Sequence, residues 1–285
     1  MRITVRDIRA MKTRGEPIPM LTAYDTSTAR LLDQAGVPIL LVGDSVGMVV
    51  LGYEDTTRVT MADMIHHVQA VVRGSARACI VADMPFMSYT VSVERAVENA
   101  GRLIQEAGAQ AVKLEGGTAV AETIRRLVAA GVPVMGHVGL TPQQVLNFGG
   151  YRVQGRSLAD AEAVLRDAIA VEAAGAFAIV LECIPSELAG LVTETLSIPT
   201  IGIGAGPACD GQVQVIHDLV GWLPDFTPKH AKRYAELGAA MRSAAEQYLA
   251  DVRGKQFPGP EHGWSLDESV RRALKDRIAA IRAGQ

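Results

Sequence analysis

The sequence has few cysteines, few aromatic residues and no long apolar segment. Its three cysteines, Cys79, Cys183 and Cys209, are far apart and form no CxxC pair. This pattern argues against a disulfide framework and is typical of free thiols in a reducing compartment. No segment approaches about 18 uninterrupted apolar residues, and the N-terminus has no apolar core of signal-peptide length. We therefore expect a cytoplasmic protein that does not span a membrane.

A block of basic residues is also absent. The net charge is −3, so neither nucleic acid nor an anionic membrane is expected as a partner. Hydrophobic residues, in contrast, make up 48% of the 285 residues, and there are 28 glycines. This composition can bury a sizeable core and suits tight turns between strands and helices. A chain of this length fits one large α/β domain or two small ones.

Short apolar runs alternate with longer helical patterns along the chain. Apolar runs rich in Val and Ile indicate parallel strands that are covered on both faces. The predicted strands are residues 18–23, 38–43, 78–82, 110–114, 133–137, 177–182, 199–203 and 213–217. The predicted helices between them are residues 26–35, 61–74, 91–107, 119–130, 157–174 and 187–195.

Eight strands separated by helices predict an α/β fold, a (β/α)₈ TIM barrel. A doubly wound open sheet is the alternative. The seventh helix is poorly defined, within residues 204–229. Two further helical patterns, at 230–252 and 266–283, predict a C-terminal helical extension. We expect one TIM-barrel domain over residues 1–285, with its C-terminal helices at about 230–285.

Polar residues follow the predicted strands. In a barrel, the C-terminal ends of the strands meet at one rim, where the active site lies. We therefore expect these side chains to form one ring around one pocket. They are Asp44 and Ser45 after the second strand, Asp83 after the third, Lys113 and Glu115 at the fourth, His137 at the fifth and Glu182 at the sixth.

The composition of this ring favours a hard cation. Three carboxylates, a single His and no thiolate are typical of a Mg²⁺ site, whereas Zn²⁺ more often has several His or Cys ligands. Such a cation could chelate a 2-oxo acid and act as a Lewis acid toward its enolate. Enolate formation also needs a base, and Glu182 stands apart from the other carboxylates in sequence. Lys113 could offset negative charge on the substrate.

Each of these residues also has a structural interpretation. Asp44 or Asp83 could cap a helix, and Ser45 could cap a turn. Lys113 could form a buried ion pair with Glu115. His137 alone could be a core histidine whose hydrogen bonds are satisfied. The coincidence of all of them on one rim favours the functional interpretation.

Seven stretches of the chain, in order, resemble the ketopantoate hydroxymethyltransferase family. The resemblance covers about residues 3 to 255. The stretches are TAYD at 22–25, GDSVGMVVLGYEDTTRVTMADM at 43–64, ADMPF at 82–86, VKLEGG at 112–117, GHVGLTPQ at 136–143, LECIP at 181–185 and IGIGAGPACDGQVQV at 201–215. No single stretch decides the assignment, but the ordered set is specific.

The resemblance implies transfer of a hydroxymethyl group from 5,10-methylenetetrahydrofolate to 3-methyl-2-oxobutanoate. The product, 2-dehydropantoate (ketopantoate), is a precursor in pantothenate biosynthesis. A cytoplasmic homodecamer is implied as well. The residues that match the family are Asp44 and Asp83 as Mg²⁺ ligands that also face the keto acid, Glu115 as a carboxylate at the metal, Ser45 and Lys113 as keto-acid contacts, His137 in the same pocket and Glu182 as the proton acceptor.

Two alternative functions remain open at this point. A Mg²⁺-dependent 2-oxo acid lyase or mutase barrel, of the phosphoenolpyruvate mutase and isocitrate lyase type, would share the carboxylate ring. Its reactive Cys in a KKCGH-like loop is absent from this sequence. A non-catalytic barrel that binds 2-oxo acids would need no base, and its acidic rim would then be an unexplained cost.

Overall fold

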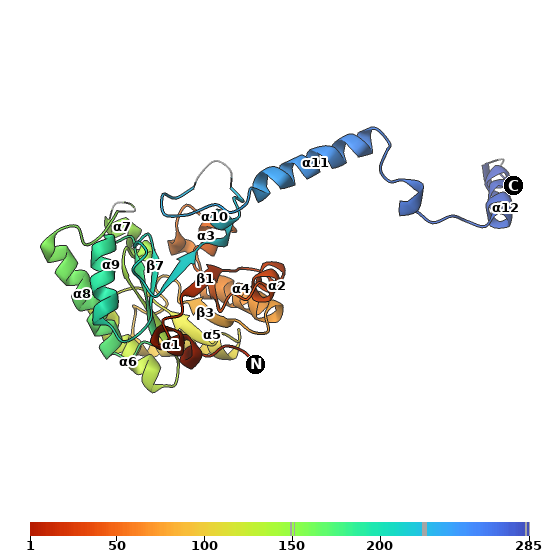
Figure 1. The fold of residues 1–285 in the computed structure, drawn as a ribbon. Helices are drawn as coiled ribbons and strands as arrows, with labels where there is room; N and C mark the ends of the chain where they lie inside the picture. Colours follow the sequence, from red (N-terminus) through yellow and green to blue (C-terminus); the bar gives the residue numbers. More distant parts are fainter. Residues whose placement is uncertain (149, 151, 224–226, 283, 285) are drawn as a thin grey trace. The chain divides into compact units, whose positions relative to one another are not determined.

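Eight parallel strands close into a barrel, in the order in which they occur along the chain (Figure 1). The computed structural model describes residues 1–148, 150, 152–223, 227–282 and 284. The strands are β1 (Ile18–Thr22), β2 (Ile39–Val42), β3 (Cys79–Asp83), β4 (Ala111–Lys113), β5 (Val134–Gly139), β6 (Ala178–Glu182), β7 (Thr200–Ile203) and β8 (Gly211–Gln214). The predicted (β/α)₈ barrel is therefore confirmed.

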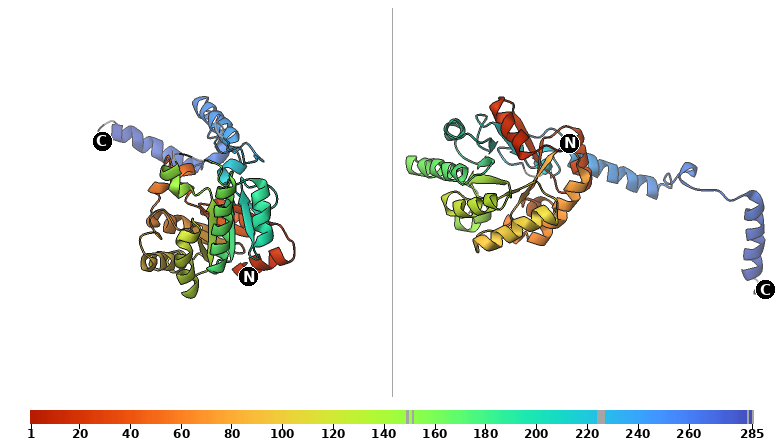
Figure 2. Two further views of the ribbon diagram at one scale, coloured as in Figure 1. Left: turned by 90° about the vertical axis from the view of Figure 1, so that its left-hand side faces the viewer. Right: turned by 90° about the horizontal axis from the view of Figure 1, so that it is seen from below.

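Helices surround the strands (Figure 1, Figure 2). Several of them begin at a polar residue that caps the helix; Ser92, for example, accepts the N–H of Arg95 at the start of α5. The helices of the barrel unit are α1 (Val5–Thr13), α2 (Thr26–Gln34), α3 (Val46–Val49), α4 (Met61–Gly74), α5 (Val93–Gln105), α6 (Ala121–Ala129), α7 (Val145–Phe148), α8 (Leu158–Ala173), α9 (Ser186–Thr195) and α10 (Ile216–Leu219).

The core has two layers because side chains alternate between the two faces of each strand. On β2, Ile39 and Leu41 belong to the cluster inside the barrel. Leu40 and Val42 belong to the cluster between the strands and the helices. All four are buried. A continuous apolar run is thus the sequence signature of a strand that packs on both sides.

Helix α1 contributes to the inner cluster, and the sequence patterns did not predict it. Thr4 and Asp7 form a capping box that starts the helix. The side chain of Ile8 is fully buried and packs with the cluster inside the barrel. The backbone N–H of Ile3 donates to the carbonyl of Arg77 at 2.7 Å, which ties the segment before the helix to the loop before β3.

The seventh and eighth units depart from the regular pattern. Strand β8 begins at Gly211, two residues before the predicted 213, because Gly211 pairs with Ile18 on one side and Ile201 on the other. Residues 204–210 between β7 and β8 are all described and contain no helix. The short helix α10 starts at Ile216, inside the range predicted as strand 213–217.

Residues 236–285 form a second compact unit, next to the barrel unit of residues 1–235 along the chain. The predicted C-terminal helices are present as α11 (Leu237–Arg253) and α12 (Glu268–Arg282). Helix α11 starts seven residues later than predicted, and position 283 of the second prediction lies outside the described residues. Neither helix has a buried residue. Among the described residues, no helix is long and apolar enough to cross a membrane.

The packing of α1 predicts a stability effect. Ile8→Ala should lower the free energy of unfolding by about 2–5 kcal/mol, because it removes a fully buried side chain and leaves a cavity. Unfolding by guanidinium chloride, followed by circular dichroism, measures the change. Arg9→Ala on the exposed side of the same helix is the control and should change it by about 0.5 kcal/mol or less. Equal effects of the two substitutions would show that α1 does not stabilise the barrel.

Candidate active site

On four neighbouring strands, the last side chain that faces the barrel interior is polar or charged. These residues are Asp83 on β3, Lys113 on β4, His137 on β5 and Glu182 on β6. In each strand, the residue two places earlier belongs to the apolar cluster inside the barrel. Strand alternation therefore aims the four side chains at the space above that cluster.

A cavity of about 640 Å³ lies at this end of the barrel. Its volume is typical of sites for small molecules. The structure places all seven predicted residues in its lining: Asp44, Ser45, Asp83, Lys113, Glu115, His137 and Glu182.

A buried ion pair joins β3 and β4. Asp83 and Lys113 are level in the strand register, and Lys113 Nζ lies 2.7 Å from Asp83 Oδ1. Asp83 Oδ2 accepts the backbone N–H of Asp44 at 3.0 Å. Asp83 therefore caps no helix, and Lys113 pairs with Asp83 rather than with Glu115. Burial lowers the pKa of Lys113, but the carboxylates of Asp83 and Glu115 outweigh it and the pKa lies above its ordinary value.

Asp44 follows β2 and is hydrogen-bonded to Gln143, which follows β5 on the other side of the rim. Its Oδ2 accepts a hydrogen bond from Gln143 Nε2 at 2.8 Å. Burial, and next the charge of Asp83, raise the pKa of Asp44 to about 7. Asp44 is thus a buried carboxylate that does not cap the helix after it, and it is only partly ionised near neutral pH in the protein without a cation.

Glu115 and His137 form a second polar group in the cavity. Glu115 Oε2 accepts the backbone N–H of Gln143 at 3.1 Å, and Oε1 lies 3.5 Å from His137 Nδ1. Burial, and next the charge of Asp44, raise the pKa of Glu115 well above its ordinary value. Burial, and next Lys113, lower the pKa of His137. His137 is therefore neutral at pH 7, and its environment of charged groups differs from that of a core histidine.

Glu182 is the most accessible carboxylate among these strand-end side chains. Its side chain is 16% exposed, whereas those of Asp83, Glu115 and His137 are 3–4% exposed. Glu182 Oε2 lies 3.2 Å from His137 Nε2. With its proton on Nε2, the neutral imidazole leaves Nδ1 as an acceptor facing Lys113 Nζ at 3.5 Å. The Nε2 atom lies close to Glu182 without the geometry of a hydrogen bond. Glu182 thus lies beside His137 and is open to a ligand.

The backbone around Glu182 is closely packed. A Cβ on Gly139, which has φ 95°, would lie 2.3 Å from the carbonyl oxygen of Glu182, so only glycine fits there. The next residue, Cys183, has φ 47°, in the left-handed region that non-glycine residues rarely adopt. The strand therefore ends in a sharp turn immediately after the carboxylate.

Ser45 does not cap helix α3, because its side chain makes no capping hydrogen bond. Its hydroxyl is instead hydrogen-bonded to the hydroxyl of Tyr24 at 2.7 Å. Tyr24 itself is buried. The Ser45 hydroxyl is thereby held at the cavity wall.

Three residues of the site were not predicted as such: Tyr24, Tyr89 and Gln143. Tyr24 and Gln143 fall in the TAYD and GHVGLTPQ stretches, but nothing in the pattern of the sequence gives them a role. The Tyr89 hydroxyl lies 2.8 Å from Gln143 Oε1 and accepts the backbone N–H of Glu115 at 3.2 Å. These two contacts join residues 54 and 26 positions apart, which local patterns do not reveal.

The donor set fits a hard divalent cation with few protein ligands. Among the described residues, no group of three or more His, Cys, Asp or Glu side chains has the arrangement of a metal site. Mg²⁺, however, is commonly held by one or two carboxylates and completes its shell with water and substrate. Asp44 and Asp83 meet this requirement, and Asp83 Oδ1 is buried without a hydrogen-bond partner apart from its ion pair with Lys113.

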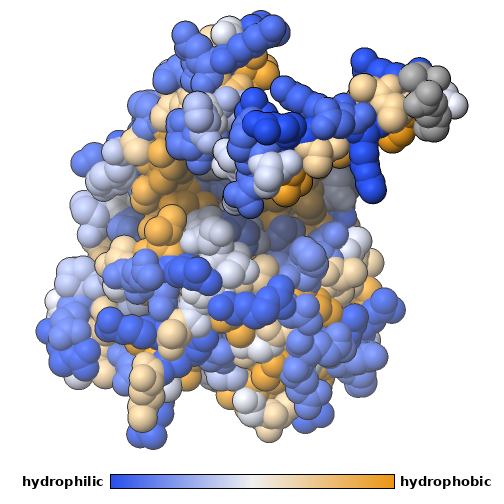
Figure 3. Space-filling view, turned by 90° about the vertical axis from the view of Figure 1, so that its right-hand side faces the viewer, coloured by the Kyte–Doolittle hydropathy of each residue, from blue (hydrophilic) through white to orange (hydrophobic). Residues whose placement is uncertain are grey.

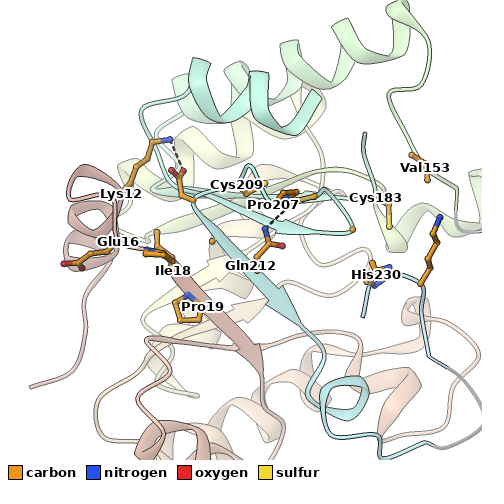
Figure 4. Close-up of a pocket in the computed structure, with 17 residues that line it drawn as sticks. Lys12, Glu16, Ile18, Pro19, Val153, Cys183, Pro207, Cys209, Gln212 and His230 are labelled. Atoms are coloured by element: carbon orange, nitrogen blue, oxygen red, sulfur yellow. Dashed lines mark hydrogen bonds and ion pairs between the residues drawn. The ribbon is translucent and has the colours of Figure 1, made fainter. Parts of the chain in front are cut away.

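A second, larger cavity of about 1130 Å³ runs past the starts of β1 and β8 (Figure 4). It contains the ion pair between Lys12 and Asp210 at 2.9 Å and the hydrogen bond from Gln212 Nε2 to the carbonyl of Gly206 at 2.9 Å. None of the seven predicted residues lines it. Cys183, on the right in Figure 4, also lines the smaller cavity, as do Val153, Lys229 and His230. The predicted chemistry therefore belongs to the smaller cavity.

Comparison with known proteins decides the family. The family model described as ketopantoate hydroxymethyltransferase matches residues 2–260. The chain belongs to this family. A 3-methyl-2-oxobutanoate hydroxymethyltransferase of Chloroflexus aurantiacus (strain ATCC 29366 / DSM 635 / J-10-fl) is 61% identical over 267 residues, which are 94% of each chain. An enzyme of the same name from Dehalococcoides mccartyi (strain CBDB1) is 56% identical and covers 96% of this chain and 99% of its own.

Membership of the ketopantoate hydroxymethyltransferase family confirms the resemblance found in the sequence, and makes the protein a transferase. Solved structures with the same fold include phosphonopyruvate hydrolase in complex with oxalate and Mg²⁺ (TM-score 0.60, 15% identity, 99% of each chain). Phosphoenolpyruvate phosphomutase from Streptomyces platensis subsp. rosaceus has TM-score 0.61 and 14% identity, over 99% of this chain and 100% of its own. At these identities the similarity shows the barrel fold alone. The family assignment decides against the lyase or mutase alternative.

The raised pKa of Asp44 predicts a pH effect on this family member. In chelator-treated protein, the pKa of Asp44 is 3.8 in the unfolded chain and is raised to about 7 in the folded protein. Wild type should therefore lose stability as the pH rises from about 4 to 7, by about 1.4 kcal/mol per pKa unit of difference. Asp44→Asn has no proton to lose, so it should be more stable than wild type at pH 8 and gain little at pH 4. Urea unfolding at both pH values measures this.

Glu98→Gln is the matched control, because Glu98 is an exposed carboxylate on α5. Its difference from wild type should not change between pH 4 and pH 8. A constant difference for Asp44→Asn as well would contradict the raised pKa.

Proposed function

We propose that the cavity catalyses hydroxymethyl transfer from 5,10-methylenetetrahydrofolate to 3-methyl-2-oxobutanoate, which gives ketopantoate. The observation that carries the proposal is that one cavity contains two separate groups, one suited to binding a cation and an anionic ligand and one suited to removing a proton. Asp44, Asp83 and Lys113 form a group suited to an anionic oxygen-rich ligand and its cation. Glu182 stands apart from this group, next to a neutral His137, where it can serve as a base. The names of the hydroxymethyltransferase relatives support the same reaction.

We propose Mg²⁺ as the metal, held by Asp44 and Asp83. The cation would act as a Lewis acid toward the 2-oxo acid, which acidifies the hydrogen on C3. Glu115 is a third candidate ligand. Its Oε2 already accepts the backbone N–H of Gln143, so a contact with the cation through water suits it better than a direct one.

The other side chains have separate roles in this proposal. Lys113 offsets the negative charge that develops on the substrate oxygen, and the Ser45 hydroxyl donates a hydrogen bond to the keto acid. Glu182 removes the C3 proton, provided that the substrate brings it within about 2.6–3.2 Å of the carboxylate. His137 Nε2 lies 3.2 Å from Glu182 Oε2, where its N–H can donate to the carboxylate once the side chains adjust to the bound substrate.

The co-substrate completes the reaction. The carbon from which Glu182 took the proton forms a bond to the methylene carbon of 5,10-methylenetetrahydrofolate. One of the two bonds between that methylene carbon and the folate nitrogens breaks, the freed nitrogen takes up a proton, and one folate nitrogen stays bonded to the carbon. Water then cleaves the bond between that methylene carbon and the folate nitrogen, which releases ketopantoate and tetrahydrofolate. The net change adds one CH₂OH group to the keto acid and consumes no oxidant or reductant.

We also propose that the protein is a cytoplasmic homo-oligomer larger than a dimer, with ten subunits implied by the family resemblance. Helices α11 and α12 support an assembly, because neither has a buried residue. Exposed apolar side chains on α11 fall at helical spacing, at Leu237, Met241, Tyr248, Leu249 and Val252. Figure 3 shows hydrophobic patches among the hydrophilic side chains of one face. Free cysteines, of which Cys79 is buried, suit the cytoplasm.

Deuterium exchange at C3 of the keto acid tests the chemistry. Proton removal precedes attack on the folate, so wild type with Mg²⁺ and 3-methyl-2-oxobutanoate in D₂O should exchange the C3 hydrogen without folate. Proton NMR would show this signal fading. Glu182→Gln has nearly the same shape but cannot accept the proton, so the exchange rate should fall about 10²-fold or more. Glu187→Gln, a surface carboxylate early in α9, is the matched control and should exchange like wild type.

Each outcome of this experiment separates one alternative. Rapid exchange by Glu182→Gln would move the base to another residue, of which His137 is the nearest. Exchange that persists after removal of divalent cations would contradict the metal. A wild-type protein that binds the keto acid without exchanging it would be the non-catalytic binding barrel.

Analytical ultracentrifugation tests the assembly. At micromolar concentration, we expect a species of about ten times the 30.3 kDa chain mass. Leu249→Asp places a charge on the apolar side of α11 and should shift the distribution toward smaller species. Gln247→Asp, an exposed polar position on the same helix, should not. A wild-type protein that sediments only as a single chain would rule out the oligomer.

A further inference from the structure

Gln143 lies behind the wall of the active-site cavity. It follows β5 in a short 3₁₀ helix (Pro142–Gln144), is 5% exposed and does not line the cavity. Its side chain nevertheless reaches two other strand ends. Gln143 Nε2 donates to Asp44 Oδ2 at 2.8 Å and to the carbonyl of Met84 at 3.0 Å. Both donors of the carboxamide are therefore used.

The orientation of the carboxamide is fixed by its neighbours. A flipped amide would place its oxygen against the Asp44 carboxylate and the Met84 carbonyl, which are both acceptors. In the observed orientation, Oε1 accepts the O–H of Tyr89 at 2.8 Å. Tyr89 in turn accepts the backbone N–H of Glu115 at 3.2 Å and is 3% exposed. The amide is therefore held on both sides by buried groups.

The backbone of Gln143 contacts a second acid. Its N–H donates to Glu115 Oε2 at 3.1 Å, while its side chain holds Asp44. Gln143, in the loop after β5, is thus hydrogen-bonded to the carboxylates that follow β2 and β4. Those two carboxylates belong to the group that, in the proposed function, receives the cation.

The chemical type of this partner matters. A Lys or Arg at this position would neutralise Asp44 and compete with a divalent cation for its charge. A neutral amide fixes Oδ2 of Asp44, and within the described part of the chain no hydrogen bond is made to Oδ1. Metal ligands in proteins are commonly oriented by such hydrogen bonds from residues that do not touch the metal.

We propose that Gln143 is a positioning residue for the divalent cation. Gln143 acts through Asp44, and Tyr89 holds Gln143 in turn. This role rests on the proposed function, in which Asp44 is a metal ligand. Gln143 makes no contact with substrate; it sets the orientation of the carboxylate and keeps its charge available. Its removal should therefore weaken cation binding in a protein that remains folded.

Binding of Mn²⁺ alone, without keto acid or folate, tests the proposal. Electron paramagnetic resonance measures free Mn²⁺ in a titration of the full-length protein. Gln143→Met keeps the length of the side chain but has no donor, so the dissociation constant should rise about 10–100-fold, as is usual for such partners. Gln144→Met changes the exposed neighbour in the same turn and should bind like wild type. Circular dichroism and melting in chelator show which variants are folded.

A second variant covers the case in which Gln143→Met does not fold. Tyr89→Phe removes the hydroxyl that orients the carboxamide and also accepts the N–H of Glu115, and it should weaken Mn²⁺ binding by less than Gln143→Met. Folded Gln143→Met with wild-type Mn²⁺ affinity would overturn the proposal, because a purely structural residue would lower the melting temperature alone. With Gln143→Met unfolded, wild-type affinity of Tyr89→Phe would overturn it.

The two proposals fail in distinguishable ways. A wild-type protein that binds neither Mn²⁺ nor Mg²⁺ and exchanges no C3 hydrogen would overturn the proposed function, and the role of Gln143 with it. Wild-type binding and exchange, together with unchanged affinity in folded variants, would overturn the role of Gln143 alone.

Discussion

The ion pair between Asp83 and Lys113 holds the centre of the site in place. Its two charges are buried side by side because the register of β3 and β4 puts them at the same level. Removing one partner of such a pair typically costs about 3–5 kcal/mol, since the other charge is left buried and uncompensated. The second oxygen of Asp83 accepts the backbone N–H of Asp44. The position of Asp44, and of every group bonded to it, therefore depends on this pair.

Around the pair, negative groups outnumber the single lysine. The pKa values of Asp44 and Glu115 are raised, because burial and mutual repulsion both disfavour the ionised forms of these carboxylates. A divalent cation would reverse that preference by supplying positive charge at the carboxylates. The neutral His137 adds no charge of its own, and it links this group to Glu182. The cavity thus keeps a base next to a cluster of acids, and the charge of Glu182 adds to the repulsion that raises the pKa of Asp44 and of Glu115.

The barrel and its polar ring could be predicted from the sequence because both follow from local patterns. Apolar runs that end in polar residues fix the strands, and alternation then sets which side chains face inward. The partner of Lys113 could not be predicted, because Asp83 and Glu115 are both compatible with the sequence and only strand register chooses between them. The contacts of Gln143 were missed for a related reason: they join loops that are distant along the chain. Helix α1 is short, and its place in the fold depends on tertiary packing of Ile8.

The way in which the barrel closes has a consequence for its folding. The seven polar groups all lie within residues 44–182, whereas the sheet is sealed when β8 pairs with β1. During synthesis, the acids leave the ribosome before the strand that encloses them, and they stay hydrated until that last pairing forms. Much of the cost of removing their water therefore falls on the closing step. The apolar side chains of Ile18, Ile201 and Val213, which come together only in that step, provide the opposing drive.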